Sequence, residues 1–169
     1  MHTGAAPCVD SARRRTSWET NPLYGRITMT QAIAYLGFDG NCADAMRFYE
    51  KVTGGKLELM MSGADSPMCN DMPPEFRHRI LHARLALPGG GKLYGGDAPA
   101  HIPYEGIKGV TITLDFDTVA RAEQVFNALA EGGQVTMPMQ PTFWAKKWGM
   151  VTDRFGCPWN INGEEIPLG

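Results

Sequence analysis

The chain has 169 residues, 43% of them apolar and 20% charged, and a net charge of −2. This composition is typical of one globular domain. A mildly acidic chain lacks the basic surface that nucleic-acid binding requires, and no apolar run in the sequence is long enough to cross a membrane. The four cysteines include no CxxC pair, which argues against a zinc knuckle or disulfide framework and predicts reduced thiols in the cytoplasm.

The first 28 residues show neither the alternation of a strand nor the stripe of an amphipathic helix. Three consecutive arginines, Arg13 to Arg15, allow a basic arm or a transit peptide, but no signal-type apolar segment is present. We expect residues 1–28 to be a disordered leader or extension, and residues 29–169 to form a single domain.

The first half of that domain predicts four strands and one helix. The helix shows an apolar face between Cys42 and Val52, with Asn41 as its N-cap and Gly54 as its stop. The predicted strands cover residues 32–38, 56–61, 80–87 and 92–97. The linker 62–79 contains three prolines and predicts an irregular loop, which is either a binding lid or a passive excursion.

The second half predicts the same order of elements. Thr118 caps a helix whose apolar face ends near Leu129, and Gly132 stops it. The predicted strands cover residues 110–116, 134–139, 147–152 and 157–162.

An internal repeat relates the two halves. Shifted by 78 positions (114 − 36), Leu36 falls on Leu114, and the apolar and glycine positions around it also coincide. From Ile80 onward the shift is 66 (146 − 80), so the preceding linker is 12 residues longer in the first half (78 − 66). Self-similarity of this kind dictates architecture. We predict an α+β domain of two βαβββ modules, about 32–97 and 109–163, whose curled mixed β-sheets surround a cavity.

Alternation in these strands leaves one face of each sheet mixed in character, polar and aromatic, as ligand pockets tend to be. The same pattern assigns Leu81 to the opposite, helix-covered face with Leu85. His82 is the candidate acid or base. Solvated strand faces and ordinary core aromatics are the competing interpretation. The candidate ligand-binding residues are Tyr35, His82, Arg84, Tyr94, Thr111, Thr113, Trp144, Trp148 and Asn160.

The layout resembles the vicinal oxygen chelate superfamily, which includes glyoxalase I, bleomycin-resistance proteins and extradiol dioxygenases, and within it the PhnB-like branch. The resemblance covers roughly residues 29–166. The stretches that carry it are residues 35–45, 48–49, 80–85, 94–97, 143–144, 149–150 and 153–159. The last three together are the most specific: Phe143-Trp144, Gly149-Met150 and Asp153-Arg154-Phe155-Gly156-Cys157-Pro158-Trp159.

Enzymes of that superfamily hold a divalent metal through His and Glu residues on the first and last strand of each module. The corresponding positions here are Ile33, Tyr94, Thr111 and Asn160, none of which is a strong ligand of such an ion. His78 and His82 would stand about 13 Å apart on a strand, too far to share a metal. We therefore expect no metal site and no cofactor.

The resemblance implies a small-molecule-binding protein that pairs into homodimers. The charge and the lack of a long apolar run predict neither nucleic acid nor membrane as a partner. Two alternatives remain open at this point. One is an enzyme with lyase, isomerase or dioxygenase-like activity, either metal-dependent or metal-free through His82. The other is a structural or interaction module. No glycine-rich loop opens a helix after a strand, so a cofactor-dependent methyltransferase is not expected.

Overall fold

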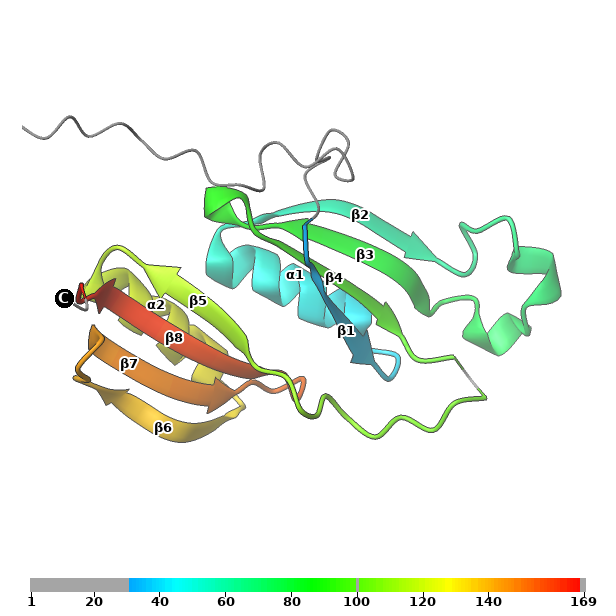
Figure 1. The fold of residues 1–169 in the computed structure, drawn as a ribbon. Coiled ribbons are helices and arrows are strands. Elements are labelled where there is room, and N and C mark those ends of the chain that lie inside the picture. The colour runs from blue at the N-terminus through cyan, green and yellow to red at the C-terminus, as the bar shows by residue number, and fades with distance from the viewer. Residues whose placement is uncertain (1–30, 100, 168–169) are drawn as a thin grey trace, which may run out of the picture. The chain divides into compact units, whose positions relative to one another are not determined.

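The first module follows the predicted order of elements. The computed structural model describes residues 31–99 and 101–167, so the predicted leader lies outside the described residues. The elements are β1 (Ala34–Phe38), α1 (Cys42–Thr53), β2 (Lys56–Ser62), β3 (Ile80–Ala86) and β4 (Lys92–Asp97). They form a four-stranded sheet in the order β1-β4-β3-β2, in which β1 pairs parallel to β4 and the other pairs are antiparallel (Figure 1).

The second module repeats this arrangement. Its elements are β5 (Ile112–Phe116), α2 (Val119–Ala130), β6 (Gln134–Gln140), β7 (Ala145–Thr152) and β8 (Pro158–Glu165). The sheet order is β5-β8-β7-β6, with β5 parallel to β8, which matches the first module strand for strand. The predicted pair of βαβββ modules with mixed sheets is therefore confirmed. The two sheets remain separate and do not close into one barrel.

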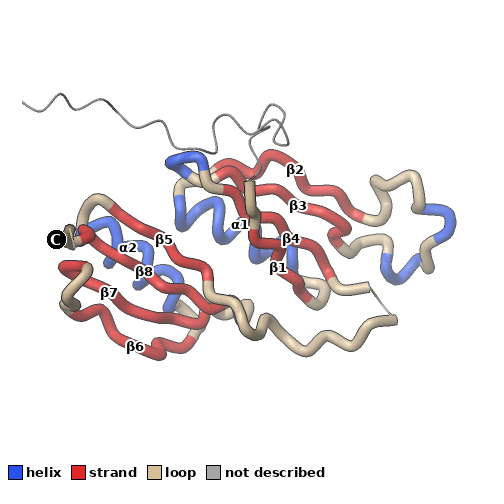
Figure 2. Tube along the Cα trace, viewed as in Figure 1, coloured by secondary structure: helices blue, strands red, loops and turns tan. Residues whose placement is uncertain are grey.

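Each helix covers one face of its own sheet, as Figure 2 shows. The strand residues on that face are buried and apolar, because alternate side chains of a strand lie on the same side. Leu36 and Phe38 of β1 are at most 1% exposed, and Trp159 and Ile161 of β8 are fully buried. The opposite face of each sheet carries the mixed side chains that the sequence assigned to the interior.

One strand departs from the predicted alternation. Met61 pairs with His82 but Ser62 pairs with Ile80, so Leu81 is an extra residue in β3 and forms a β-bulge. Ile80 is buried instead, at 6% exposed, and Leu81 is only half-buried. The prediction that Leu81 lies on the helix-covered face was wrong, because simple alternation does not anticipate a bulge.

The start of α1 is capped differently from the prediction. The Asn41 side chain makes no capping hydrogen bond. The Asp97 carboxylate at the end of β4 accepts from the backbone N–H groups of Gly40 and Cys42, at 2.8 and 3.0 Å, and from that of Ile80 at 2.7 Å. Asp97 thus joins three segments of the first module. At the other end Gly54 adopts φ 75° and closes the helix, as predicted.

The helix α2 begins as predicted, with the Thr118 hydroxyl accepting from the Arg121 N–H at 3.3 Å. A carboxylate from the last strand contributes here too, since Glu164 accepts from the Val119 N–H at 3.2 Å. Both modules therefore use an acidic residue at the end of their last strand to satisfy the positive end of a helix.

Aromatic rings join the two modules into one core. Tyr49 of α1 packs edge-on against Trp159 of β8, with ring centroids 5.1 Å apart, and Phe48 lies 5.6 Å from Phe155. Arg121 of α2 donates to the Val52 carbonyl at the end of α1, at 3.0 Å. Neither module would bury these surfaces alone, which explains why two short modules form one hydrophobic core. Within the described residues, no helix is long and apolar enough to cross a membrane.

Candidate functional site

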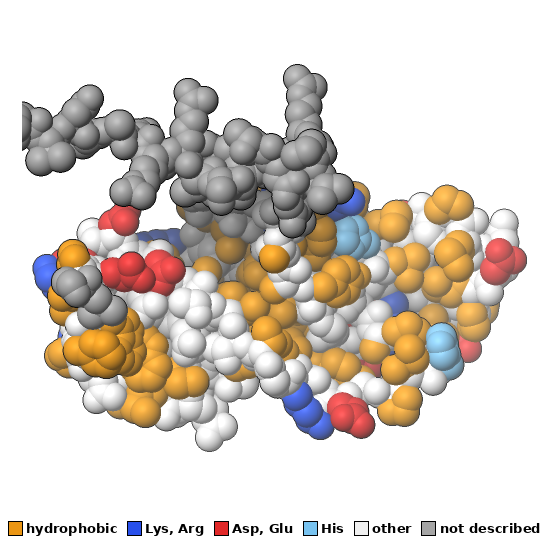
Figure 3. Space-filling model, viewed as in Figure 1, with side chains coloured by type: hydrophobic (Ala, Val, Ile, Leu, Met, Phe, Trp, Pro, Cys, Tyr) orange, Lys and Arg blue, Asp and Glu red, His pale blue; other side chains and the backbone are white. Residues whose placement is uncertain are grey.

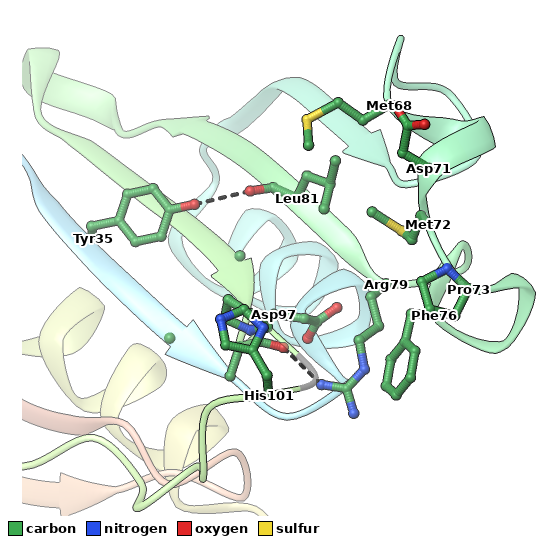
Figure 4. Close-up of a pocket in the computed structure, with 14 residues that line it drawn as sticks. Tyr35, Met68, Asp71, Met72, Pro73, Phe76, Arg79, Leu81, Asp97 and His101 are labelled. Atoms are coloured by element: carbon green, nitrogen blue, oxygen red, sulfur yellow. Dashed lines mark hydrogen bonds between the residues drawn. The ribbon is translucent and has the colours of Figure 1, made fainter.

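The longer linker of the first module builds a cavity at one end of its sheet. The linker contains two short 3₁₀ helices, η2 (Cys69–Asp71) and η3 (Pro74–Phe76), and it lines the cavity together with residues of β1, β3 and β4 (Figure 4). The cavity has a volume of about 580 Å³, within the range of small-molecule pockets. Its walls are largely apolar and include Tyr35, Met68, Met72, Pro73, Phe76, Leu81, Ala98 and Pro99.

Specific contacts hold this linker in place. The N–H of Gly63 donates to the Arg79 carbonyl at 2.9 Å, and that of Ala64 to the Arg77 carbonyl at 2.8 Å, so the two ends of the linker are clamped together. The Arg77 side chain donates to the Met72 carbonyl at 3.2 Å. Met72 packs closely over Gly63, where an added Cβ would lie 2.4 Å from the Met72 sulfur and would displace that side chain. The linker is therefore an ordered wall of the cavity.

The charged residues that border the cavity are already engaged in the fold. Arg79 pairs with Asp39 at 3.0 Å, donates to the Ala98 carbonyl at 3.0 Å and stacks over the Phe76 ring. Asp97 is occupied by the three backbone N–H groups described above. His101 also borders the cavity. The space that remains favours apolar and aromatic groups.

A cluster of aromatic and basic side chains continues from the cavity along the open face of the first sheet. Tyr35 and Tyr94 are direct neighbours on β1 and β4, and Arg84 of β3 stands opposite Tyr94. The His82 ring stacks on Tyr35 with centroids 5.7 Å apart and meets Tyr94 edge-on at 5.1 Å. The Arg84 guanidinium lies over the Tyr94 ring at 5.4 Å. We call these four residues the Tyr35–Arg84 cluster.

The hydrogen bonds of this cluster form a chain in which each group donates to the next, from Arg84 to the Leu81 carbonyl. The Arg84 Nε–H donates to His82 Nε2 at 3.0 Å, which requires that nitrogen to be unprotonated. The ring proton then resides on Nδ1, which lies 3.5 Å from the Tyr35 hydroxyl. That hydroxyl donates in turn to the Leu81 carbonyl at 3.1 Å (Figure 4). His82 is thus held neutral, and partial burial and then the Arg84 charge lower its pKa.

This arrangement changes the interpretation of His82. Its one lone pair on Nε2 already accepts from Arg84, so it is not available to remove a proton from a substrate. We interpret His82 as a residue that positions Arg84. The two buried thiols are not reactive nucleophiles either: burial and then the nearby Asp97 raise the pKa of Cys42 to about 12, and burial also raises that of Cys157.

The open face of the second sheet carries a separate aromatic group. Trp144 meets Trp148 edge-on at 5.5 Å and Phe143 at 4.7 Å. The Trp144 indole donates to Asn162 at 3.3 Å, and the Asn162 amide donates to Asp115 at 2.8 Å. Hydrophobic side chains reach the surface over the ends of β7 and β8, as Figure 3 shows. We call Phe143, Trp144 and Trp148 the Trp144–Trp148 cluster.

The structure divides the predicted site residues between these two faces. Tyr35, His82, Arg84 and Tyr94 form one contiguous cluster, and Trp144 and Trp148 belong to the other. Thr113 and Asn160 are direct neighbours on β5 and β8, and Thr111 precedes β5. Within the described residues, no side-chain hydrogen bond or ring contact connects one cluster with the other.

Sequence reasoning missed the residues of the linker wall, Met68, Met72 and Phe76. The extra length of the linker was the only signal, and it did not indicate which side chains face inward. It also missed Asn162 and Asp115, although their alternation with Asn160 and Thr113 placed them on the same face.

The sequence of this chain matches those of known proteins. The sequence pattern of the Glyoxalase/Bleomycin resistance protein/Dioxygenase superfamily matches residues 33–161. The chain belongs to this superfamily. The predicted glyoxalase/bleomycin-resistance fold is thereby confirmed. Protein YjdN of Escherichia coli (strain K12) is 32% identical over 136 residues, covering 76% of this chain and 91% of the relative.

Solved structures of similar proteins share this fold. Protein PA1353 from Pseudomonas aeruginosa is 47% identical, with a TM-score of 0.73 over 79% of this chain and 97% of that one. A PhnB protein from Bacillus cereus is 20% identical, with a TM-score of 0.66 over 79% of this chain and 98% of that one. The second likeness concerns the fold alone.

Proposed function

We propose that this protein binds a small planar molecule in the cavity of the first module and on the adjoining Tyr35–Arg84 cluster. The observation that carries the proposal is the continuity of the two features, because Tyr35 belongs to both and Leu81 lines the cavity beside it. Aromatic rings offer stacking surfaces, and the Met-rich wall adapts its shape to an apolar ligand. Binding without chemistry is favoured over catalysis because His82 has no free lone pair.

We propose further that binding needs no divalent metal. The positions that would hold one carry Ile33, Tyr94, Thr111 and Asn160, and neutral side chains of these types do not compete for such an ion. The Tyr94 ring is also engaged by His82 and Arg84. The donor set therefore does not fit the metal that the superfamily implies.

A second copy of the chain is proposed as the partner that encloses the ligand. Both sheets leave an aromatic face open, with Tyr35 55% exposed and Phe143 73% exposed. In a twofold dimer, the Tyr35–Arg84 cluster of one copy would face the Trp144–Trp148 cluster of the other, and the reverse. The predicted shared interior would then form between two chains. The cytoplasmic location remains a prediction, which the free thiols of Cys42, Cys69 and Cys157 support.

Methyl NMR tests the binding proposal on the full chain. With ¹³C-methyl methionine, 2-naphthamide should shift the Met68 and Met72 signals, while Met139, which packs against the core, reports any general effect. Leu81→Trp should block these shifts by filling the cavity. Ile102→Trp is the matched control, because Ile102 is 52% exposed and does not line the cavity. Shifts that persist in Leu81→Trp would contradict the proposed site.

Two further measurements test the metal and dimer proposals. Incubation with Zn²⁺, Ni²⁺, Mn²⁺ or Fe²⁺, followed by desalting, should leave no ion bound, and retention near one per chain would contradict the metal-free proposal. Sedimentation equilibrium should give a dimer that Phe143→Glu weakens and Ile102→Glu does not. A wild-type monomer at micromolar concentration would contradict the dimer.

A further inference from the structure

Arg84 is a cation fixed in place by neutral partners. Its Nε–H donates to His82, and its guanidinium lies over the Tyr94 ring. Fixing a long, exposed arginine side chain in one conformation costs side-chain entropy. An arginine that moved freely in solvent would not bear this cost. The His82 ring is itself fixed by Tyr35 on one face and Tyr94 at its edge. Three residues of the sheet, His82, Tyr94 and Tyr35, thus hold one guanidinium in a defined place.

Two of the other described arginines have a carboxylate partner, which Arg84 lacks. Arg79 pairs with Asp39 at 3.0 Å, and Arg47 lies 3.8 Å from Asp44. In the part of the chain that the structure describes, no carboxylate oxygen lies within 4.0 Å of an Arg84 nitrogen. The terminal NH₂ groups of Arg84 likewise make no hydrogen bond to any described residue. They remain available as a planar donor fork.

A fork of this kind matches a carboxylate or another oxyanion, which accepts two parallel N–H groups. It lies on the same sheet face as Tyr35, whose ring borders the apolar cavity. A ligand that fills the cavity with its apolar part would therefore extend along the Tyr35–Arg84 cluster toward the guanidinium.

We infer that the ligand of this site carries a negatively charged oxygen group, such as a carboxylate, which Arg84 binds while His82 positions the guanidinium. The inference rests on the proposed binding function and adds the chemical class of the ligand. It assigns recognition of charge to Arg84 and recognition of shape to the cavity. His82 is in this view a positioning residue that does not exchange a proton with the ligand.

A matched pair of probes separates charge from shape. We would titrate the full chain with 2-naphthoate and with its neutral isostere 2-naphthamide, and measure both dissociation constants by methyl NMR. We expect 2-naphthoate to bind about tenfold more tightly, which is the contribution of one charge-assisted hydrogen-bond pair. Arg84→Gln should bring the two probes to within about twofold of each other. Arg47→Gln is the matched control, because it removes the same charge from an exposed position on α1.

A second variant tests the role of His82. His82→Phe keeps a ring between Tyr35 and Tyr94 but removes the Nε2 acceptor, so the preference for 2-naphthoate should fall while binding of 2-naphthamide is retained. The Arg84 Nε–H resonance should also lose its His82-dependent shift in this variant. A preference that His82→Phe leaves unchanged would refute the positioning role.

The remaining outcomes distinguish the inference from the proposed function. Equal binding of the two probes to the wild-type protein would overturn the inference and leave the binding function intact. A preference that survives Arg84→Gln, or that Arg47→Gln reduces equally, would overturn the assignment to Arg84. Binding of neither probe would contradict both the inference and the proposed function.

Discussion

The Asp97 carboxylate gives the sharpest test of how the first module is held together. It accepts three backbone N–H groups, from Gly40, Cys42 and Ile80, at 2.7 to 3.0 Å. Asp97→Asn retains one carbonyl oxygen, which is enough for the two donors at the start of α1. The hydrogen bond from the Ile80 N–H to the other oxygen is lost. Ile80 is only 6% exposed, so its N–H is left without an acceptor.

The cost follows from these contacts. Losing a hydrogen bond to a charged acceptor costs about 2 kcal/mol, and removing the charge beside the α1 N-terminus adds up to about 0.5 kcal/mol. Asp97→Asn should therefore lower the free energy of unfolding by about 2–3 kcal/mol. For a chain of this size, the melting temperature should fall by about 5–10 °C.

Urea unfolding followed by tryptophan fluorescence measures the change, with an unchanged m-value confirming that the denatured state is the same. Asp44→Asn is the matched control. Asp44 lies in the first turn of the same helix, but its side chain is 77% exposed, so a change below about 0.5 kcal/mol is expected. If Asp97→Asn costs no more than Asp44→Asn, the three contacts do not stabilise the module and the reasoning is wrong.

Three other predictions concern buried or clustered groups. Tyr49→Phe should leave the free energy of unfolding unchanged or raise it by about 1 kcal/mol, because the buried Tyr49 hydroxyl has no hydrogen-bond partner among the described residues. A clearly lower free energy of unfolding in urea would show that this hydroxyl does form a stabilising hydrogen bond. The pKa of His82 is lowered from 6.5, so its contribution to stability is present above pH 6.5 and is lost as the pH falls through the folded-state value. Arg84→Gln should raise this pKa in an NMR titration, and a fall would contradict the assigned contacts. Gly96→Ala should abolish the methyl shifts caused by 2-naphthamide, because the added Cβ would lie 2.6 Å from the Tyr35 hydroxyl; retained shifts would show that the wall yields.

The order and type of the elements could be predicted because the same apolar pattern occurs twice in the chain. Leu36 and Leu114 mark equivalent strands, and both helices begin and end within a residue or two of the predicted positions. Two copies of one pattern remove the ambiguity that a single short apolar run leaves.

The site was predicted less completely, for physical reasons. Alternation placed His82 and Arg84 on one face because strand geometry alone decides that question. It could not place Met68 or Phe76, because an irregular linker has no period. Nor could it predict that His82 is neutral, since this depends on the partial burial of the ring and on the Arg84 Nε–H donor two residues away.

The bulge at Leu81 has a consequence for how such a site changes during evolution. One extra residue in β3 moves a leucine from the helix-covered face to the wall of the cavity, while Ala83 and Leu85 beyond it stay in the core. A single inserted or deleted codon at this position would therefore exchange a cavity-lining side chain without any substitution in the core. Relatives that differ in length here would present differently shaped cavities even where their aligned residues are identical.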